Sequence, residues 1–325
     1  MSSDNGPIRI EVPTVFEMGT VNSYLFKLPV PTLIDCGERS DGSWDALLNG
    51  LSDEGLTITD IDRVIITHAH VDHMGMAAKV VEVSGAKVWV SDMVRPWAVD
   101  LDKVQSDRWN TIMRLLTEIT GKEDSPMHQG FARFFKNYTS YWDPIPAESI
   151  EVFRVGDSLS LGDGQWEVKY APGHCINQTC FYNNESKELL AADMLLKIAA
   201  TPVIDADLKD PQQRAEGLSV MMDTMKEFMA LELSTVYPGH YKPITNGNEL
   251  LKKQLHRIDQ RIEQTYKLIS EGPKNFFEIL QHMYKGRVSG PAIPMMIGYL
   301  DVLLTNEMIT SSQSPEGLQY SISAN

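Results

Sequence analysis

Alternating apolar and polar positions mark short strands along much of the chain, and stretches with a helical repeat separate them. The pattern predicts strands over residues 8–12, 22–28, 32–36, 63–67, 87–91, 150–155, 165–171, 178–183, 188–192 and 234–237. It predicts helices over residues 44–51, 74–83 and 211–231. Strands interleaved with helices indicate an α/β (α+β) protein.

The segment 93–147 has a helical repeat and many aromatic residues. It holds eight of the 27 aromatic residues, namely Trp97, Trp109, Phe131, Phe134, Phe135, Tyr138, Tyr141 and Trp142. One interpretation is a helical insert that packs its aromatic rings on itself. Another is a cap that lines an apolar substrate pocket, and the two can hold together.

The C-terminal part of the chain changes to a mostly helical pattern. A long polar helix is predicted over 246–270, shorter helices over 275–285 and 292–309, and a small hairpin at the end. We therefore expect a catalytic domain over 1–245, with 93–147 as its insert, and a helical extension over 246–325.

Charge and cysteine content limit the partners and the compartment. The 325 residues carry a net charge of −15, and nearly all of the excess lies before residue 250. Such a surface disfavours nucleic acid and attracts cations. The expected partner is a small-molecule substrate. Three cysteines do not make a disulfide framework. The first residues lack a secretory pattern and no run of about 18 apolar residues exists, so we expect a cytoplasmic protein without a membrane span.

Three of the eight histidines lie within six residues, in the motif HAHVDH at 68–73. Residues two apart on an extended segment point to one side, so His68 and His70 can hold one ion. Asp72 and His73 then lie on the following turn and can reach a second ion. Imidazole and carboxylate ligands suit Zn²⁺, with Mn²⁺ and Fe²⁺ as substitutes.

Further candidate ligands follow other predicted strands. His174 and His240 each come after Pro-Gly at a strand exit, and Asp193 ends the strand LLAAD. An α/β fold that gathers strand ends at one edge would bring these residues to the HAHVDH motif. The remaining histidines lack such a context and are interpreted as structural or surface residues: His128, His256 and His282.

Taken together and in this order, HAHVDH (68–73), APGH (171–174), AAD (191–193) and YPGH (237–240) resemble the metallo-β-lactamase superfamily. LIDCG (33–37) is similar to an early motif of that family, and the resemblance covers roughly residues 8–245. It implies an αββα sandwich with a dinuclear metal site at one edge of two sheets. The tail 246–325 resembles the winged-helix-like extension of some family members.

The resemblance also implies a ligand set. His68, His70 and His174 would hold the first ion, while Asp72, His73 and His240 would hold the second and Asp193 would bridge them. Asp35 would orient a ligand imidazole. The chain departs from the family pattern beside these motifs at Met76, Cys175 and Tyr241.

The expected activity is that of a metal-dependent hydrolase using a metal-bridging hydroxide. Asp72 or Asp193 would transfer a proton to the leaving group, and Tyr241 or Tyr182 is a candidate donor to the oxyanion. A thioester, lactone or other small ester with an apolar acyl part is the favoured substrate. The alternatives are a phosphodiesterase or ribonuclease, a flavodiiron-type redox protein and a metal-binding scaffold. The extension is also a candidate surface for a homodimer.

Overall fold

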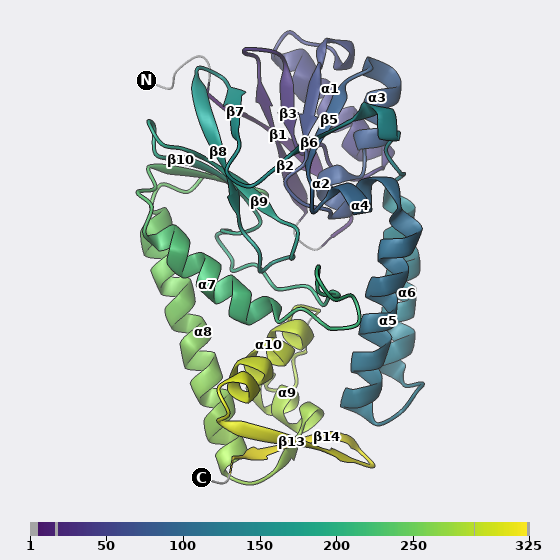
Figure 1. Ribbon diagram of the computed structural model, residues 1–325, viewed down its shortest axis with the longest axis vertical. Coiled ribbons are helices and arrows are strands. Elements are labelled where there is room, and N and C mark those ends of the chain that lie inside the picture. Colours follow the sequence, from purple (N-terminus) through teal and green to yellow (C-terminus); the bar gives the residue numbers. More distant parts are fainter. Residues whose placement is uncertain (1–5, 17–18, 289, 324–325) are drawn as a thin grey trace.

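Two β-sheets face each other in the computed structural model, which describes residues 6–16, 19–288 and 290–323 (Figure 1). The first sheet is ordered β1-β2-β3-β4-β5-β6. Its strands are β1 (Ile8–Pro13), β2 (Thr20–Phe26), β3 (Thr32–Ile34), β4 (Arg63–Ile65), β5 (Lys87–Ser91) and β6 (Ile150–Phe153). The pairs from β3 to β6 are parallel, while β2 is antiparallel to both of its neighbours, β1 and β3.

The second sheet is ordered β11-β10-β9-β8-β7. Its strands are β7 (Ser158–Leu161), β8 (Gly164–Tyr170), β9 (Thr179–Asn183), β10 (Glu188–Ala192) and β11 (Thr235–Pro238). The β10–β11 pair is parallel and the others are antiparallel. The sequence pattern did not predict β7, whose four residues are half serine.

Each sheet has two apolar faces, which is why its central strands β2, β3, β9 and β10 are buried almost throughout. In β2, Tyr24 and Phe26 pack against Trp166 and Phe181 of the second sheet, while Leu25 belongs to the core on the opposite face. Side chains alternate between the faces of a strand, so one strand serves both cores. The layer between the sheets fixes their edges relative to each other.

Helices cover the outer faces of both sheets. The first sheet packs against α1 (Asp41–Asp53) and α3 (Ala77–Ser84), whose buried Leu47 and Val80 lie in its outer core. The second sheet packs against α7 (Gly217–Met229) and α8 (Gly247–Ser270). The expected αββα sandwich is confirmed. Short 3₁₀ turns cover Ile58–Asp60, Thr139–Tyr141 and Ala147–Ser149.

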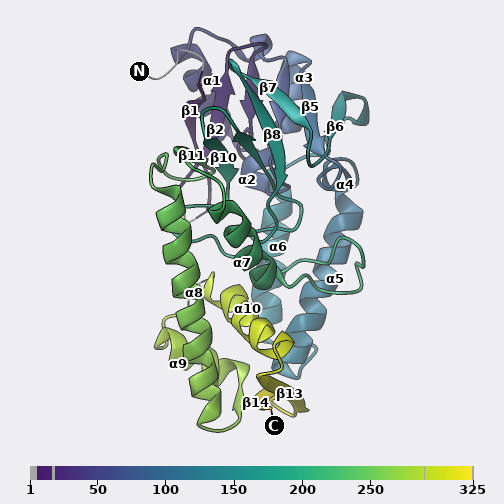
Figure 2. The ribbon, with the colours of Figure 1, turned by 60° about the vertical axis from the view of Figure 1, so that its left-hand side comes forward.

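The insert consists of α4 (Arg95–Val99), α5 (Leu101–Thr120) and α6 (Pro126–Tyr138), which extend away from the sandwich (Figure 2). Some of its aromatic rings pair within the segment: Trp97 with Trp142 at 6.2 Å and Trp109 with Phe135 at 5.3 Å between ring centroids. Phe131 and Tyr141 pack against the apolar cores that flank the two sheets. The aromatic residues of the insert therefore contact both one another and the rest of the protein. The side chain of Tyr138 lies outside the described part.

The C-terminal extension continues from α8 through β12 (Lys274–Asn275), α9 (Phe276–Tyr284), α10 (Ala292–Thr305), β13 (Ile309–Ser314) and β14 (Gly317–Ile322). Its three strands form a small sheet ordered β12-β14-β13. The predicted long helix, two shorter helices and terminal hairpin are found, although α10 ends four residues earlier than predicted. Its apolar residues share one core with α5, α7 and the second sheet. Homodimer formation through it stays a prediction.

The far end of α5 meets the extension. Gly121, which ends α5 with a φ of +66°, lies so close to β14 that a Cβ there would be 2.8 Å from the Gly317 nitrogen. A Cβ on Gly317 would in turn collide with the Ile119 carbonyl oxygen. Insert and extension are therefore in direct contact. Within the described ranges, no helix has the length and apolar content needed to cross a membrane.

Candidate metal centre

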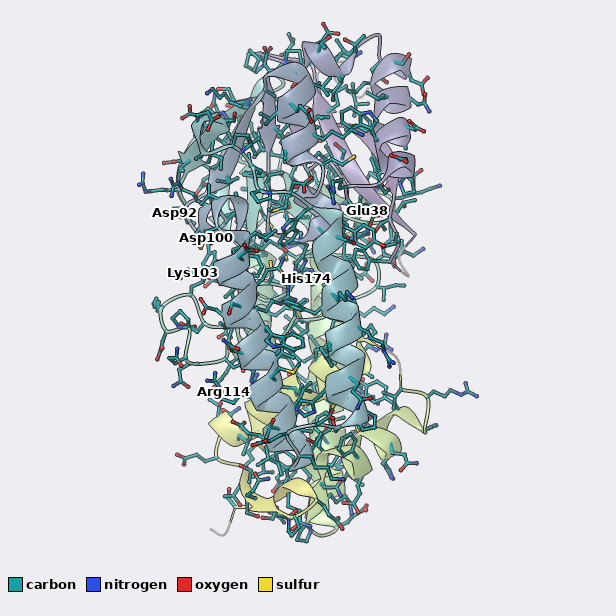
Figure 3. All side chains as sticks on the ribbon, turned by 90° about the vertical axis from the view of Figure 1, so that its right-hand side faces the viewer. Glu38, Asp92, Asp100, Lys103, Arg114 and His174 are labelled. Carbon is teal, nitrogen blue, oxygen red and sulfur yellow. The ribbon has the colours of Figure 1, made fainter. Side chains whose placement is uncertain are left out.

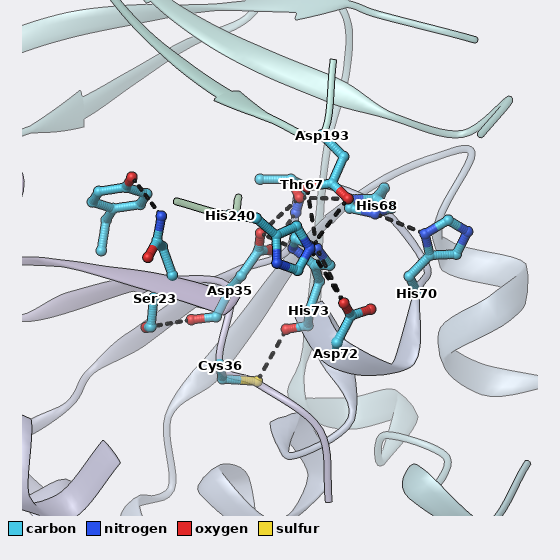
Figure 4. A network of polar contacts seen from close by, with 12 residues as sticks. Ser23, Asp35, Cys36, Thr67, His68, His70, Asp72, His73, Asp193 and His240 are labelled. Atoms are coloured by element: carbon cyan, nitrogen blue, oxygen red, sulfur yellow. Dashed lines mark hydrogen bonds and ion pairs between the residues drawn. The ribbon is translucent and has the colours of Figure 1, made fainter. Parts of the chain in front are cut away.

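The candidate metal ligands meet at one edge of the two sheets, where strands end, and Figure 4 labels all of them except His174. Asp35 follows β3, and the HAHVDH motif follows β4 and enters the short helix α2 (Val71–Met74). His174 follows β8, Asp193 follows β10 and His240 follows β11. The predicted convergence of strand ends is found.

One group of side chains, here called the first position, comprises His68, His70, His174 and Asp193. His70 Nδ1 lies 3.0 Å from His68 Nε2 and 3.0 Å from His174 Nε2. His174 Nε2 is also 3.4 Å from Asp193 Oδ2. Three imidazoles from two loops thus direct nitrogen atoms at one point.

The second position comprises Asp72, His73, His240 and Asp193. His240 Nε2 is 3.4 Å from both Asp72 Oδ2 and Asp193 Oδ2. His73 Nε2 lies 3.5 Å from Asp193 Oδ1 and 3.9 Å from Asp72 Oδ2. Asp193 therefore borders both positions.

These distances fit bound cations. Ligand atoms roughly 2 Å from a tetrahedral zinc ion lie about 3.4 Å apart. In the described part of the chain, His73 Nε2, His240 Nε2 and Asp193 Oδ1 are buried without a hydrogen-bond partner. A buried polar atom without a partner is unfavourable unless something binds it. The donor set suits Zn²⁺, Mn²⁺ or Fe²⁺. The role of each residue as a ligand stays a prediction.

The second nitrogen of four of these imidazoles has a fixed partner. His174 Nδ1 donates to the Thr201 carbonyl oxygen at 2.7 Å, and His240 Nδ1 donates to the Thr20 carbonyl oxygen at 2.6 Å. A carbonyl oxygen can only accept, so in the neutral form of each ring the proton is on Nδ1 and the lone pair is on Nε2. Both rings thus present the correct nitrogen to a metal ion.

Asp35 orients an imidazole in each position. Its Oδ2 is 2.7 Å from His73 Nδ1 and accepts the Thr67 hydroxyl at 2.8 Å. Because that hydroxyl proton is directed at Asp35, the Thr67 oxygen accepts from His68 Nδ1 at 2.9 Å. Asp35 has a φ of +59°. This left-handed conformation is uncommon for a residue other than glycine and often occurs at functional sites.

Burial dominates the electrostatics of the first position. It lowers the pKa of His68 and His70 well below the usual value, and neighbouring imidazoles lower both further. Burial also lowers the pKa of His174, although Asp193 partly offsets the effect. These rings are neutral at pH 7, the form that binds a metal ion.

Carboxylates dominate the second position. Burial would lower the pKa of His240, but Asp193 and Asp72 outweigh it and raise the value to about 10. The pKa of His73 is likewise raised well above its usual value, against burial, by Asp193, Asp35 and Asp72. Burial would raise the pKa of Asp72, but His73 and His240 lower it to about 2.

The two Pro-Gly turns need glycine for different reasons. A Cβ on Gly239 would collide with Asp193 Oδ1 and come within 2.8 Å of His73 Cε1. Gly173 has a φ of +142°, and Met221 occupies the space of its Cβ. Asn22 holds the later turn, since its side-chain amide donates to the Pro238 and Tyr241 carbonyl oxygens at 2.8 and 2.7 Å.

Sequence reasoning missed the side chain of Thr67 and the carbonyl groups of Thr20 and Thr201, because such partners leave no motif. It placed Tyr182 wrongly as a candidate oxyanion donor. Residues of β9 alternate between faces, and Tyr182 points into the helical layer, where its hydroxyl donates to the Glu232 carbonyl oxygen at 2.9 Å. Cys175 Sγ lies within 4.8 Å of ligand atoms of His68 and His70, and burial raises its pKa well above the usual value.

Comparisons with known proteins agree with this geometry. A family profile described as the metallo-β-lactamase superfamily matches residues 19–240. A Bacillus subtilis (strain 168) protein called "Probable metallo-hydrolase YqjP" is 27% identical over 316 residues, covering 94% of each chain.

Solved structures share the whole architecture. A metallo-beta-lactamase family protein from Thermus thermophilus has a TM-score of 0.79 at 21% identity, covering 98% of each chain. A beta-lactamase domain protein from Burkholderia ambifaria has a TM-score of 0.75 at 19% identity, covering 97% of this chain and 92% of its own. At these identities the likeness shows the fold, and its span includes the insert and the extension.

Proposed function

The chain belongs to the metallo-β-lactamase superfamily, and on that premise we propose that it is a dinuclear metallohydrolase that cleaves a thioester, a lactone or another small ester with an apolar acyl part. Family membership and the metallo-hydrolase relative support metal-dependent hydrolysis in general. The observation that carries the proposal is Asp193, which lies within 3.5 Å of imidazoles from both positions.

The two positions would hold two divalent ions, preferably Zn²⁺, with Mn²⁺ or Fe²⁺ as substitutes. When bound, such a pair lowers the pKa of a shared water towards about 7 and polarises a carbonyl oxygen. The chain supplies lone pairs that are already oriented, because Thr20, Thr67 and Thr201 fix the proton positions of three rings.

The carboxylates of Asp72 and Asp193 are the groups that would move protons. The low pKa of Asp72, about 2, keeps it ionised at neutral pH despite its burial. An ionised carboxylate at this place can accept a proton from the attacking water and pass it to the leaving group. A thiolate leaves without that proton more readily than an alkoxide does.

The acyl substrate is favoured by charge and by the insert. A polyanionic substrate such as a nucleic acid would be repelled by a protein with a net charge of −15. The insert places aromatic residues on α5 and α6, on one side of the strand-end edge (Figure 3). A phosphodiesterase or ribonuclease remains the alternative that the experiment must separate.

The test uses purified protein loaded with zinc, which should contain about two equivalents by elemental analysis. A panel of a thioester, a homoserine lactone, an aryl ester and bis-p-nitrophenyl phosphate identifies the bond that is cleaved. His70→Ala should lower kcat/KM at least about 1,000-fold, since a ligand is lost. His256→Ala, on the exposed face of α8, is the matched control and should change little.

Turnover of the phosphodiester alone would contradict the proposed acyl substrate but would still agree with a metal-dependent hydrolase. If the zinc-loaded protein cleaved none of the four substrates, or if His70→Ala kept its turnover, the hydrolase itself would be rejected. Circular dichroism of both variants establishes that they are folded.

A further inference from the structure

The buried face of α5 carries a row of polar side chains at its end nearest the sandwich. Gln105, Arg108 and Thr111 follow one another at intervals of three, so they share one face of the helix. Their exposed fractions are 7%, 8% and 2%. Further along the helix the same buried side becomes apolar, with Leu115, Leu116 and Ile119 in the core. A buried arginine needs compensating neighbours, and those of Arg108 include a carbonyl oxygen, an aromatic ring and a nearby acid.

Arg108 lies close to the first position. Its Nε donates to the Ile204 carbonyl oxygen at 3.4 Å. The same segment holds His174: the Thr201 carbonyl accepts its Nδ1 proton at 2.7 Å, and the Val203 nitrogen donates to its carbonyl at 2.8 Å. In Figure 3, His174 is seen between α5 and α6 at the level of the first turns of α5.

Electrostatics agrees with this placement. Burial and His174 lower the pKa of His70, and the charge of Arg108 lowers it further. The guanidinium also lies 5.9 Å from the centre of the Trp97 ring, which supports one side of it. Asp205 is a buried acid nearby, and its pKa is raised by burial and partly lowered again by Arg108.

Two neighbours of Arg108 have hydrogen-bond donors without an acceptor. Within the described ranges, Gln105 Nε2 and Thr111 Oγ1 are buried and have no hydrogen-bond partner. Other threonines of α5 behave differently: Thr117 and Thr120 donate to the carbonyl oxygens of Met113 and Leu116 at 3.0 and 2.7 Å. Thr111 therefore does not use the partner that its helix offers.

We propose that Gln105, Arg108 and Thr111 form a recognition site for an anionic, oxygen-rich group of the substrate, a carboxylate or a phosphate, whose acyl bond lies at the metal positions. The guanidinium, the amide nitrogen and the hydroxyl all donate, so the matching ligand offers several acceptors and a negative charge. The inference rests on the proposed function and names a second feature of the same substrate.

The kinetic test compares matched thioesters: S-succinyl with S-butyryl compounds, and S-acyl mercaptoacetate with its methyl ester. The wild type should prefer the charged member of at least one pair, and that pair locates the anion on the acyl or the thiol side. Arg108→Gln should lower the ratio of kcat/KM between the charged and the neutral member about 10- to 100-fold, because any disturbance of His70 or His174 affects both members alike. Arg108→Lys should restore part of the preference, and Thr111→Val should lose a smaller part.

Lys103→Gln is the matched control, because it removes one positive charge from the exposed face of the same helix. If the wild type cleaves both members of each pair equally, or if Arg108→Gln behaves like Lys103→Gln, the inference is overturned while the hydrolase stands.

A binding test does not depend on turnover. The melting temperature of the metal-free protein is measured with monomethyl succinate, methyl phosphate and neutral dimethyl succinate. Either anion should raise it in the wild type and in Lys103→Gln, whereas Arg108→Gln should show no shift beyond that of the neutral ester. Equal shifts in Arg108→Gln and the wild type would overturn the inference. This comparison decides it even if no thioester is cleaved and the proposed function fails.

Discussion

The two candidate metal positions both combine imidazole nitrogens with carboxylate oxygens, but they differ in the balance between the two. In the first position three imidazoles face one another, and burial keeps them neutral. In the second, His73 and His240 face the carboxylates Asp72 and Asp193, which favour the protonated rings. Without metal, protons on His73 and His240 therefore balance the carboxylate charge of the second position. The imidazoles of the first position carry no such protons.

This difference explains how one chain can keep so many buried polar groups together. Carboxylates left alone in the interior would be unfavourable, and the protonated imidazoles compensate them until a cation arrives. The imidazoles of the first position are already neutral, so a cation does not have to replace protons there. We therefore expect the first position to accept an ion without losing protons, and the second to accept one only by releasing them.

Removing Asp193 should have the largest effect, because this residue borders both positions. Asp193→Ala should reduce bound zinc from about two equivalents to one or fewer and lower kcat/KM at least about 1,000-fold. Elemental analysis and steady-state kinetics on a cleaved thioester measure the two effects. Asp223→Ala, an exposed aspartate on α7 with a side-chain exposure of 72%, is the control. Two retained equivalents in Asp193→Ala would show that the positions do not depend on it.

Asp35 should affect both positions to different degrees. Asp35→Asn weakens the direct partner of His73 and, through Thr67, the partner of His68, so zinc affinity should fall about 10- to 100-fold. Thr67→Val removes the second link alone and should weaken the first position by a smaller factor. Competition with a chromophoric chelator gives both affinities. Equal losses in the two variants would contradict the direct role of Asp35 towards His73.

The cluster of candidate ligands could be predicted from the sequence because each of them lies at or just after the end of a strand. A motif such as HAHVDH fixes three imidazoles within six residues, and Pro-Gly marks two more strand exits. Strand ends meet at one edge in an open sheet, so the convergence follows from topology without any knowledge of distances. The family resemblance then supplied the division into two positions.

What the sequence could not supply is the layer of contacts behind the ligands. The carbonyl groups that hold His174 and His240 come from Thr201 and Thr20, and a backbone carbonyl carries no residue preference. The two Pro-Gly turns look alike in sequence, yet one glycine makes room for Asp193 and the other adopts a conformation suited to glycine. The row on α5 was hidden for another reason: Gln105, Arg108 and Thr111 read as an ordinary polar helix face until their burial is known.

The contrast between the positions also predicts a difference in pH dependence. With a pKa of about 10, His240 holds a proton at pH 7 in the metal-free protein, and so does His73. Since zinc binds the neutral ring, raising the pH towards 10 removes the competing proton, and zinc affinity should rise about tenfold per unit for each proton displaced. The first position, whose rings are already neutral, should bind zinc with nearly constant affinity between pH 7 and 8. Zinc titrations against a chelator at pH 6.5, 7, 7.5 and 8 resolve the two classes, and a pH indicator in weak buffer counts the protons released. Two classes with the same pH slope would show that carboxylates and burial do not separate the positions.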